Sequence, residues 1–519
     1  MFRGWNVAES ARAIIRPMTF LQLLDGAEVL YQSGDPIVTG VQYDSRRVGK
    51  GDAFVAMRGE STDGNRFIDR AIAQGAVAVV TDSADEKPRP GFAWAQVPHG
   101  RRALARIAAN FYHHPAEKLS LVGITGTNGK TTTTFLVESI FEAAGRKSAL
   151  VGTIEYHVAG RSVPAPHTTP ESLELNQVYA EAVSDGAADA VMEVSSHALA
   201  QERVFGIPFD VAVFTNLTRD HLDFHRSMDE YYTAKRGLFE GCGTEPPRVS
   251  VINIEDEYGS RLARESKSAE KIAYGIERGE FHAANVDIRP SGTRFDMLIG
   301  SEAVPIFTPL LGRVNVYNAL AAAAAAWARG CTGDAIARGI ESRRSVPGRF
   351  ERVDCGQPFQ VVVDYAHTDA ALRNVSALAR SLVGSGGRVI TVFGCGGDRD
   401  RSKRPLMGEA AGRGSDFVVL TSDNPRSEDP MAIINDAKSG LEQTGTRFAI
   451  EPDRRNAIAA AVGAAKPGDI VVIAGKGHEK VQVTRAGASP FDDVEVAREV
   501  LRSNGHDPSL VTAQTEGRR

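Results

Sequence analysis

Short, uniformly apolar runs alternate with helical stretches along most of this chain, and this alternation constrains its fold more than any other feature. The clearest runs are FVAM (54–57), AVAVV (76–80), LSLVGIT (119–125), AADAVMEV (187–194), FDVAVFTN (209–216) and VSVINI (249–254). Four more lie near 360–364, 388–393, 416–421 and 469–474. Such runs are typical of strands covered by helices on both faces, so the pattern predicts parallel α/β sheets.

The length of 519 residues is too great for one ordinary core and predicts about three domains. We place them at 18–115, 116–346 and 347–503, with SVPGRF (345–350) as the linker before the third. Residues 1–17 are interpreted as an extension, because Met18 directly precedes the helix-like TFLQLLDG. The polar residues 504–519 are predicted to form a loose tail.

Composition excludes several classes of protein. A net charge of −5 and a pI near 6.2 give no electrostatic footprint for nucleic acid. The four cysteines form no C-x-x-C pair, which favours a reducing cytoplasm over a disulfide framework or a zinc site. The apolar run ALAAAAAAWA (319–328) is much shorter than a membrane span of about 20 residues and predicts a buried alanine-rich helix. We therefore expect a cytoplasmic protein with neither a nucleic-acid nor a membrane partner.

A strand, a glycine turn and a helix meet in GITGTNGKTTTT (123–134). Backbone N–H groups at such a turn face an anion, Lys130 can reach phosphates, and the Thr131 hydroxyl can ligate Mg²⁺. Ile124 stands where the usual phosphate-loop motif has its first glycine. The predicted nucleotide-binding residues are Gly126, Thr127, Asn128, Gly129, Lys130, Thr131 and Thr132. The loop alone does not separate a kinase, a GTPase and a ligase.

Two further strand ends carry candidate metal ligands. Glu193 ends one apolar run, and Asp220 and His221 follow the next. Because the carboxyl ends of parallel strands share one edge of a sheet, a carboxylate and an imidazole there indicate Mg²⁺ near the triphosphate. A capping carboxylate and a surface histidine are the alternatives for Glu193 and His221.

Over about 19–497 the chain resembles the Mur ligases, and among them the members that add diaminopimelate. The shared motifs occur in the family's order: YDSRRVGKGDAFVAMRG (43–59), GTNGKTT (126–132), HTTP (167–170), MEVSSHAL (192–199), QERV (201–204), TNLTRDHLDFH (215–225), AKRGLF (234–239), GRVNVYNALAA (312–322), PGRFE (347–351), VDYAHT (363–368), GCGGDRDRSKRP (394–405), SDNPR (422–426) and AGKGHE (474–479).

The resemblance implies three α/β domains: an N-terminal UDP-binding domain, a central P-loop-type parallel-sheet ATPase domain and a C-terminal Rossmann-like domain. It also implies a reaction, in which a substrate carboxylate takes the γ-phosphate of ATP and an amine then displaces phosphate from the acyl phosphate. The implied substrates are UDP-N-acetylmuramoyl-L-alanyl-D-glutamate and meso-2,6-diaminopimelate, the implied cofactors ATP and two Mg²⁺ ions, and the implied state a monomer.

Residue roles follow from the matched positions. Lys130 resembles the phosphate clamp, and Thr131, Glu193 and His221 resemble metal ligands. Lys235 matches the family's carbamylated lysine (N6-carboxylysine), although the residues alone indicate a solvated helix lysine. The remaining positions expected to approach ATP are Asn318, Arg349, Asp364 and His367, of which Arg349 and His367 would reach it only after domain closure. Asp369-Ala370 departs from the family's Pro-Asp after Thr368 and leaves the helix start there open.

The substrate residues are implied in the same way. The muramoyl substrate is expected at Thr168, Thr169, Ser195, Gln201 and Arg203, and its uridine end at Ser45 and Arg46. The amino acid is expected at Arg399, Asp423, Asn424, Arg426, Gly475 and Glu479. A planar guanidinium at Arg426 suits the distal carboxylate that distinguishes diaminopimelate from lysine.

Three alternatives stay open. One is the same ligation with L-lysine or another amino acid. The second is a ligase like folylpolyglutamate synthetase, against which the YDSRRV block and DNPR argue. The third is a nucleotide-hydrolysing switch that ligates nothing. Phosphate release that requires both the dipeptide nucleotide and the amino acid separates a ligase from a switch.

Overall fold

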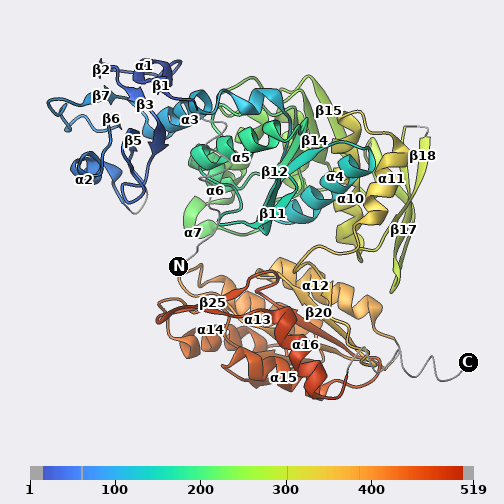
Figure 1. The fold of residues 1–519 in the computed structure, drawn as a ribbon. Coiled ribbons are helices and arrows are strands. Elements are labelled where there is room, and N and C mark those ends of the chain that lie inside the picture. Colours follow the sequence, from blue (N-terminus) through green and yellow to red (C-terminus); the bar gives the residue numbers. More distant parts are fainter. Residues whose placement is uncertain (1–15, 60–61, 301, 385, 507–519) are drawn as a thin grey trace, which may run out of the picture.

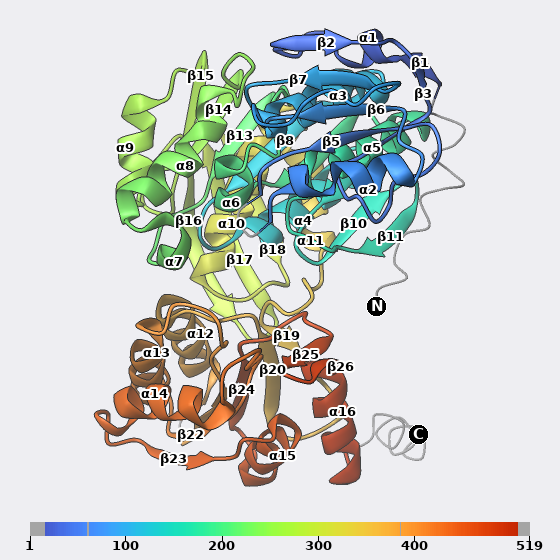
Figure 2. The same cartoon turned by 90° about the vertical axis from the view of Figure 1, so that its left-hand side faces the viewer.

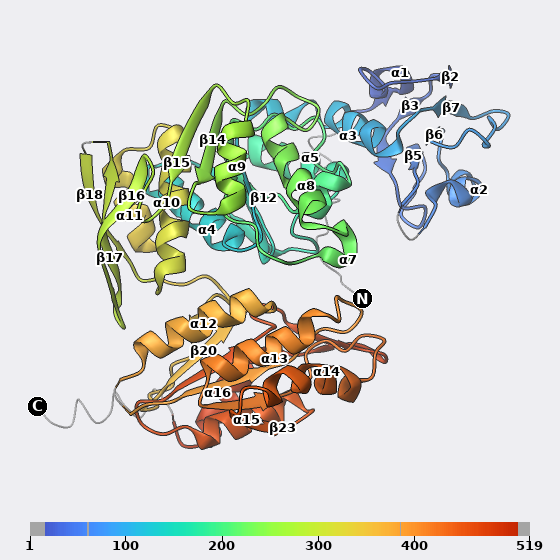
Figure 3. The ribbon, with the colours of Figure 1, turned by 180° about the vertical axis from the view of Figure 1, so that it is seen from behind.

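The computed structural model describes residues 16–59, 62–300, 302–384 and 386–506, and these form three α/β domains in a row along the chain. Figure 1 shows the N-terminal sheet beside the large central sheet, with the C-terminal sheet below the central one. The view from behind shows the same separation of all three domains (Figure 3), and the view from the side shows the C-terminal domain apart from the other two (Figure 2). The predicted extension 1–17 and tail 504–519 lie mostly outside the described residues.

The N-terminal sheet has five strands in the order β2-β7-β6-β5-β4, parallel except for the β2–β7 pair. The strands are β2 (Tyr31–Ser33), β4 (Gly40–Gln42), β5 (Asp52–Ala56), β6 (Ala78–Thr81) and β7 (Ala93–Gln96). The helices are α1 (Phe20–Leu23), α2 (Ile68–Ala73) and α3 (Gly100–Phe111), and β1 (Met18–Thr19) pairs with β3 (Ile37–Val38).

The central sheet has eleven strands in the order β11-β10-β9-β12-β8-β13-β14-β15-β16-β17-β18. Its parallel part contains β8 (Ser120–Thr125), β9 (Ser148–Val151), β12 (Asp189–Glu193), β13 (Val211–Phe214), β14 (Val249–Asn253) and β15 (Glu270–Tyr274). Antiparallel strands extend both edges: β10 (Glu155–Val158) and β11 (Arg161–Pro164) at one, and β16 (Phe281–Arg289), β17 (Gly292–Ile299) and β18 (Glu302–Thr308) at the other, where β16 joins β15 in parallel.

Helices cover both faces of this sheet. They are α4 (Lys130–Ala143), α5 (Ser172–Ser184), α6 (Ser196–Ala200), α7 (Leu222–His225), α8 (Met228–Glu240), α9 (Glu257–Glu265), α10 (Arg313–Ala328) and α11 (Gly333–Ser342). The predicted alanine-rich helix is α10, whose residues 318–326 are all buried. Their small side chains let α10 pack closely against both the neighbouring α4 and the sheet.

The C-terminal sheet has the order β19-β20-β24-β21-β22-β23 and is parallel except for β19. Its strands are β19 (Glu351–Arg352), β20 (Gln360–Asp364), β21 (Val389–Phe393), β22 (Phe417–Leu420), β23 (Arg447–Ile450) and β24 (Ile470–Ala474). The helices are α12 (Asp369–Leu382), α13 (Lys403–Gly414), α14 (Pro430–Glu442), α15 (Arg454–Ala464) and α16 (Asp493–Ser503), and a hairpin of β25 (Val481–Thr484) and β26 (Gly487–Pro490) follows β24.

The structure confirms the predicted α/β class, because each of the ten apolar runs contains a strand. It also settles the helix start after His367, since the Thr368 hydroxyl caps α12 by accepting from the Ala371 amide. Among the described residues, no helix combines the length and apolar character needed to cross a membrane.

Candidate functional site

The glycine turn after β8 has the shape of a phosphate-binding loop. Gly126 and Gly129 have φ values of 149° and 88°, and α4 begins at the next residue, Lys130. A Cβ at Gly126 would collide with the side chain of Thr215, and one at Gly129 would collide with that of Asn318. Glycine is therefore required at both positions, and Asn318 of α10 lies against the loop.

Lys130 is folded back on this loop. Its Nζ donates to the carbonyl oxygens of Gly126 and Thr127, both at 2.9 Å. Burial lowers the pKa of Lys130, while the nearby Glu193 and Asp220 carboxylates oppose that shift. A phosphate group offers a stronger partner than these two carbonyls, so the lysine is placed to exchange them for nucleotide oxygens.

Thr131 and Glu193 meet beneath the loop. The Thr131 hydroxyl donates to Glu193 Oε2 at 3.1 Å, and Thr153 holds the carboxylate through its amide (2.7 Å) and its hydroxyl (2.9 Å). This pair of hard oxygen donors suits Mg²⁺. Within the described part of the chain, no three His, Cys, Asp or Glu side chains are grouped to hold a metal, so an ion here would complete its shell with nucleotide oxygens and water.

Lys235 of α8 is buried beneath the same loop rather than solvated. Its Nζ donates to the Gly126 carbonyl at 2.7 Å and lies 4.6 Å from the centre of the Tyr231 ring. Burial, reinforced by Lys130, places the pKa of Lys235 well below its usual value. A neutral amine is the form that reacts with CO₂, so this environment fits the carbamate that the resemblance implies.

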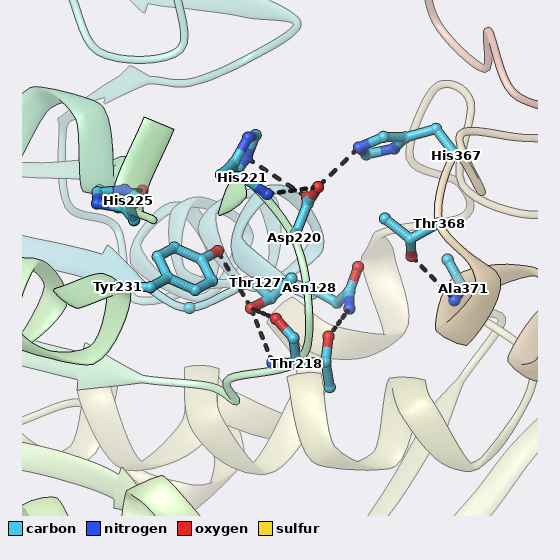
Figure 4. A network of polar contacts seen from close by, with 12 residues as sticks. Thr127, Asn128, Thr218, Asp220, His221, His225, Tyr231, His367, Thr368 and Ala371 are labelled. Carbon is cyan, nitrogen blue, oxygen red and sulfur yellow. Dashed lines mark hydrogen bonds and ion pairs between the residues drawn. The ribbon is translucent and has the colours of Figure 1, made fainter. Parts of the chain in front are cut away.

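Asp220 lies between two histidines from different domains (Figure 4). Its Oδ2 is 3.4 Å from His221 Nε2 and 3.6 Å from Nε2 of His367, which belongs to the C-terminal domain. Burial raises the pKa of Asp220, but His367, His221 and Lys403 outweigh burial, so the net pKa lies well below the usual range. Burial lowers the pKa of His221 to about 3, which keeps its ring neutral and able to ligate a metal.

The C-terminal domain also reaches the phosphate loop through Arg349. Its Nη2 donates to the Thr131 hydroxyl at 3.1 Å. Asp364 fixes the surrounding backbone, since its carboxylate accepts from the amides of Phe350 (2.7 Å) and Ala366 (2.8 Å). Arg349 and His367 were expected to reach ATP only after domain closure, and in this structure they contact Thr131 and Asp220 of the central domain.

The residues expected to hold the muramoyl substrate form one connected group. Thr168 accepts from the Thr153 hydroxyl (3.1 Å), which ties it to Glu193. Thr169 contacts Ser195 through the Ser195 amide (3.1 Å), and Arg203 donates to the Thr169 carbonyl (2.9 Å) and to Gln201 Oε1 (2.7 Å). Arg203 is held in turn by Glu171 at 3.0 Å.

Ser45 and Arg46 lie apart from this group, in the N-terminal domain after β4. Ser45 is buried, whereas Arg46 is exposed and pairs with Asp44 at 2.7 Å. The same loop touches the central domain where the Tyr43 hydroxyl donates to Glu174 at 3.1 Å. The predicted uridine residues are thus joined to the central domain through their neighbours.

The residues expected to hold the amino acid do come together. They line a cleft of about 230 Å³ between the central and C-terminal domains. The cleft is lined by Asp220, His221, Asp223, Tyr365, His367, Gly394, Gly396, Arg399, Asp400, Lys403, Met407, Asp423, Asn424, Arg426, Gly475 and Glu479. It therefore holds all six predicted amino-acid residues beside His221 and His367, next to the loops expected to carry ATP.

The sequence did not single out five polar side chains of this region: Asp223, Tyr365, Asp400, Lys403 and the fully buried Lys476. Each is inside or next to a motif quoted for the resemblance, but a lysine or aspartate in a glycine-rich loop is usually solvated. The position of Lys476 in the chain could have indicated its importance. It directly follows Gly475 at the carboxyl end of β24, the edge of a parallel sheet where ligands bind.

Comparisons with known proteins agree with this geometry. The family descriptions "Mur ligase family, catalytic domain", "Mur ligase middle domain" and "Mur ligase, glutamate ligase domain" match residues 37–112, 124–326 and 348–477. A protein of Solibacter usitatus named UDP-N-acetylmuramoyl-L-alanyl-D-glutamate--2,6-diaminopimelate ligase is 53% identical over 476 residues, covering 90% of this chain and 94% of that protein. One of the same name from Geobacter metallireducens is 46% identical over 489 residues, covering 90% and 94%.

Solved structures give the same result. A structure of a ligase with that name matches with a TM-score of 0.67 at 32% identity, covering 95% of this chain and 100% of the other. The Mycobacterium tuberculosis folylpolyglutamate synthase complexed with ADP has a TM-score of 0.60 at 20% identity, covering 78% and 95%, and so shares the fold. Motifs, fold and relatives agree, and the chain belongs to the Mur ligase family.

Proposed function

We propose that this chain is an ATP-dependent, ADP-forming ligase that adds meso-2,6-diaminopimelate to UDP-N-acetylmuramoyl-L-alanyl-D-glutamate during peptidoglycan precursor synthesis in the cytoplasm. The observation that carries the proposal is the cleft, where Arg399, Arg426 and Glu479 border the histidines beside the phosphate loop. Two guanidinium groups and a carboxylate match a ligand that has both a carboxylate and an ammonium at its distal end.

The chemistry needs positioning and charge neutralisation. The substrate carboxylate attacks the γ-phosphate of ATP, which gives an acyl phosphate and ADP. The amine of the amino acid then attacks the carbonyl, phosphate leaves, and the nitrogen loses a proton. Lys130 and Arg349 stand where they can neutralise phosphate charge from two domains, and this electrostatic role is the usual one in phosphoryl transfer.

The residues around the loop fit two bound Mg²⁺ ions, which neutralise phosphate charge when present. Thr131 and Glu193 would hold the first. His221 and carbamylated Lys235 would hold the second ion. The ring of His221 is neutral and can ligate a metal, and the buried amine of Lys235 suits carbamate formation. Asp220 keeps His221 and His367 facing each other across the cleft.

Lysine is the nearest alternative amino acid. It has an ammonium for Glu479 but no distal carboxylate, so it would leave Arg426 without a partner. A site built to bind a polar group rejects an analogue that lacks the group by about 10⁴-fold or more. The cleft therefore favours diaminopimelate.

The deciding experiment measures phosphate release with ATP, Mg²⁺ and the dipeptide nucleotide, in the presence of diaminopimelate, lysine or ornithine. We expect release only when the nucleotide substrate and diaminopimelate are both present. Release without either would favour a nucleotide-hydrolysing switch, and a preference for lysine would overturn the assigned amino acid while leaving the ligase.

A further inference from the structure

Lys476 is a fully buried lysine behind the wall of the amino-acid cleft, in the loop that follows β24. Its Nζ donates to Asn424 Oδ1 (3.1 Å), Glu479 Oε2 (3.1 Å) and the Val481 carbonyl (2.7 Å). An ammonium has three N–H donors, so each has an acceptor. Burying such a group is unfavourable unless it is fully paired, and here the pairing is complete.

Two of the three acceptors line the cleft, and they are also bonded to each other. Asn424 Nδ2 donates to Glu479 Oε2 at 2.7 Å, so Lys476, Asn424 and Glu479 form a closed triangle. A third cleft residue, Asp423, has its Oδ1 3.7 Å from Lys476 Nζ. Lys476 itself does not line the cleft, and its effect on a ligand must pass through these side chains.

The triangle leaves one oxygen of Glu479 available. Both bonds go to Oε2, and no group in the described chain donates a hydrogen bond to Oε1. The carboxylate is thereby held at one oxygen and open at the other, which is the arrangement that an incoming ammonium needs. Asn424 is fixed as well, because its Oδ1 also accepts from the Val483 amide at 2.9 Å.

An ion pair at the opposite, amino-terminal edge of the same sheet provides the contrast. Arg388, before β21, pairs at 2.6 Å with the buried Asp469, before β24, and neither lines the cleft. Lys476 differs because its partners are the residues that face the ligand. Its charge also lies beside two cleft carboxylates, those of Asp423 and Glu479.

We propose that Lys476 is a positioning residue for amino-acid recognition, which orients Glu479 and Asn424 so that the free oxygen of Glu479 receives the distal ammonium of the amino acid. This inference rests on the proposed function. It predicts that losing Lys476 weakens amino-acid binding selectively, since the three acceptors of its ammonium belong to Asn424, Glu479 and Val481 and not to the residues expected to bind ATP or the nucleotide substrate.

The test is steady-state kinetics of Lys476→Met and Lys476→Gln, with each substrate varied in turn. We expect the KM for diaminopimelate to rise about 10–100-fold in Lys476→Met, by analogy with the loss found when groups that orient the ligands of a metal ion are removed. The KM values for ATP and the dipeptide nucleotide should change by no more than about twofold, because that binding is not touched. Lys476→Gln keeps N–H donors and should fall between Lys476→Met and wild type.

Two controls separate recognition from stability. Arg388→Met breaks the Arg388–Asp469 pair of the same domain and should lower Tm without a selective rise in the KM for the amino acid. Lys480→Met removes an exposed lysine four residues away, paired with Asp492, and should behave as wild type. Equal changes in all three KM values, an unchanged KM for diaminopimelate, or failure of both Lys476 variants to fold would overturn the proposal.

The outcome is separable from that of the proposed function. If wild type uses a different amino acid, the same comparison is made with that amino acid. A selective rise in its KM would keep the role of Lys476, although the assignment of diaminopimelate would be lost.

Discussion

Arg426 is the residue on which the choice of amino acid depends. It has a left-handed backbone (φ 52°), and its Nη1 donates to the Gly397 carbonyl at 2.6 Å. Burial lowers the pKa of Arg426, and the nearby Arg399 lowers it further. An arginine held in an uncommon backbone conformation beside a like charge is costly for the fold, and an anionic ligand would relieve that cost.

We therefore expect Arg426→Ala to raise the KM for diaminopimelate strongly and to leave those for ATP and the dipeptide nucleotide nearly unchanged. Losing one partner of a buried charge pair corresponds to about 2–5 kcal/mol. The matched control is Arg455→Ala, since Arg455 is exposed on α15, where it pairs with Glu499. Kinetics with each substrate varied will decide, and use of diaminopimelate by Arg426→Ala as efficiently as by wild type would refute the assignment.

Lys235 allows a prediction with a spectroscopic readout. Its buried amine should take up CO₂, so wild type equilibrated with ¹³C-bicarbonate should show a carbamate signal in ¹³C NMR. Lys235→Ala should lack that signal and most of the activity, and a short carboxylic acid should restore part of the activity. Lys267→Ala serves as the control, because Lys267 is exposed. A fully active Lys235→Ala would show that no carbamate is needed.

For single residues, the sequence predicted those whose positions in recognisable motifs imply a role. The predicted amino-acid residues gather in one cleft, because each directly follows a strand of the C-terminal sheet or lies in a loop beside one. Lys476 was missed because its importance comes from Asn424, 52 positions away in the chain, and from the burial that their contact produces. Whether a lysine is solvated or buried is decided by tertiary packing, which its local sequence does not encode.

Among the elements, α4 and β10 are joined by a charged cluster behind the phosphate loop. His157 of β10 lies 2.5 Å from Glu138 of α4 and 2.9 Å from Glu155, and Arg343 reaches Glu138 at 3.3 Å. Burial lowers the pKa of His157, but the two carboxylates outweigh burial and raise it to about 9. A charged histidine thus ties the helix that begins at Lys130 to the neighbouring hairpin.

The sign of the pH effect follows from this raised pKa. Protonated His157 stabilises the folded state fully below about pH 6.5, the ordinary value, and that contribution is lost as the pH rises through about 9. His157→Gln should therefore lower Tm at pH 6 and have little effect at pH 9.5, whereas His282→Gln should show no such trend. A Tm difference independent of pH, measured by thermal unfolding, would contradict the role of the charge.

The sequence predicted the strands that are apolar on both faces, but it missed strands that mix polar and apolar residues. The antiparallel strands β16, β17 and β18 were not predicted, because segments such as FHAANVDIR mix polar and apolar residues. Such strands at a sheet edge have one open face and lack the continuous apolar pattern of β8 or β24. The domain limits at 115 and 346 stay predictions.

At the scale of the whole molecule, the central and C-terminal domains are in contact through a few polar pairs. Arg219 donates to the Ser402 hydroxyl at 2.7 Å, beside the Arg349–Thr131 and His367–Asp220 contacts. An interface that is held by polar pairs like these favours domain motion over a rigid arrangement. We infer that ligands on both sides of the cleft stabilise the arrangement seen in Figure 1.

Small-angle scattering tests this inference. The radius of gyration should fall when a non-hydrolysable ATP analogue and the dipeptide nucleotide are added to wild type. Arg349→Ala should show a smaller decrease, because its contact at Thr131 is lost, and Arg313→Ala, a surface change within the central domain, should match wild type. An identical radius with and without ligands would mean that the domains do not close.

The division of labour across the cleft has a practical meaning for engineering and for evolution. All six residues expected to select the amino acid belong to one domain, whereas the phosphate loop belongs to another. The choice of building block is thus carried by a single domain, which a short linker joins to the phosphate-loop domain and which also brings Arg349 and His367 to the phosphate site. Recombination at that linker would combine the same central ATPase domain with a pocket for a different amino acid. This is a simple route by which the amino-acid composition of cell walls could change during evolution.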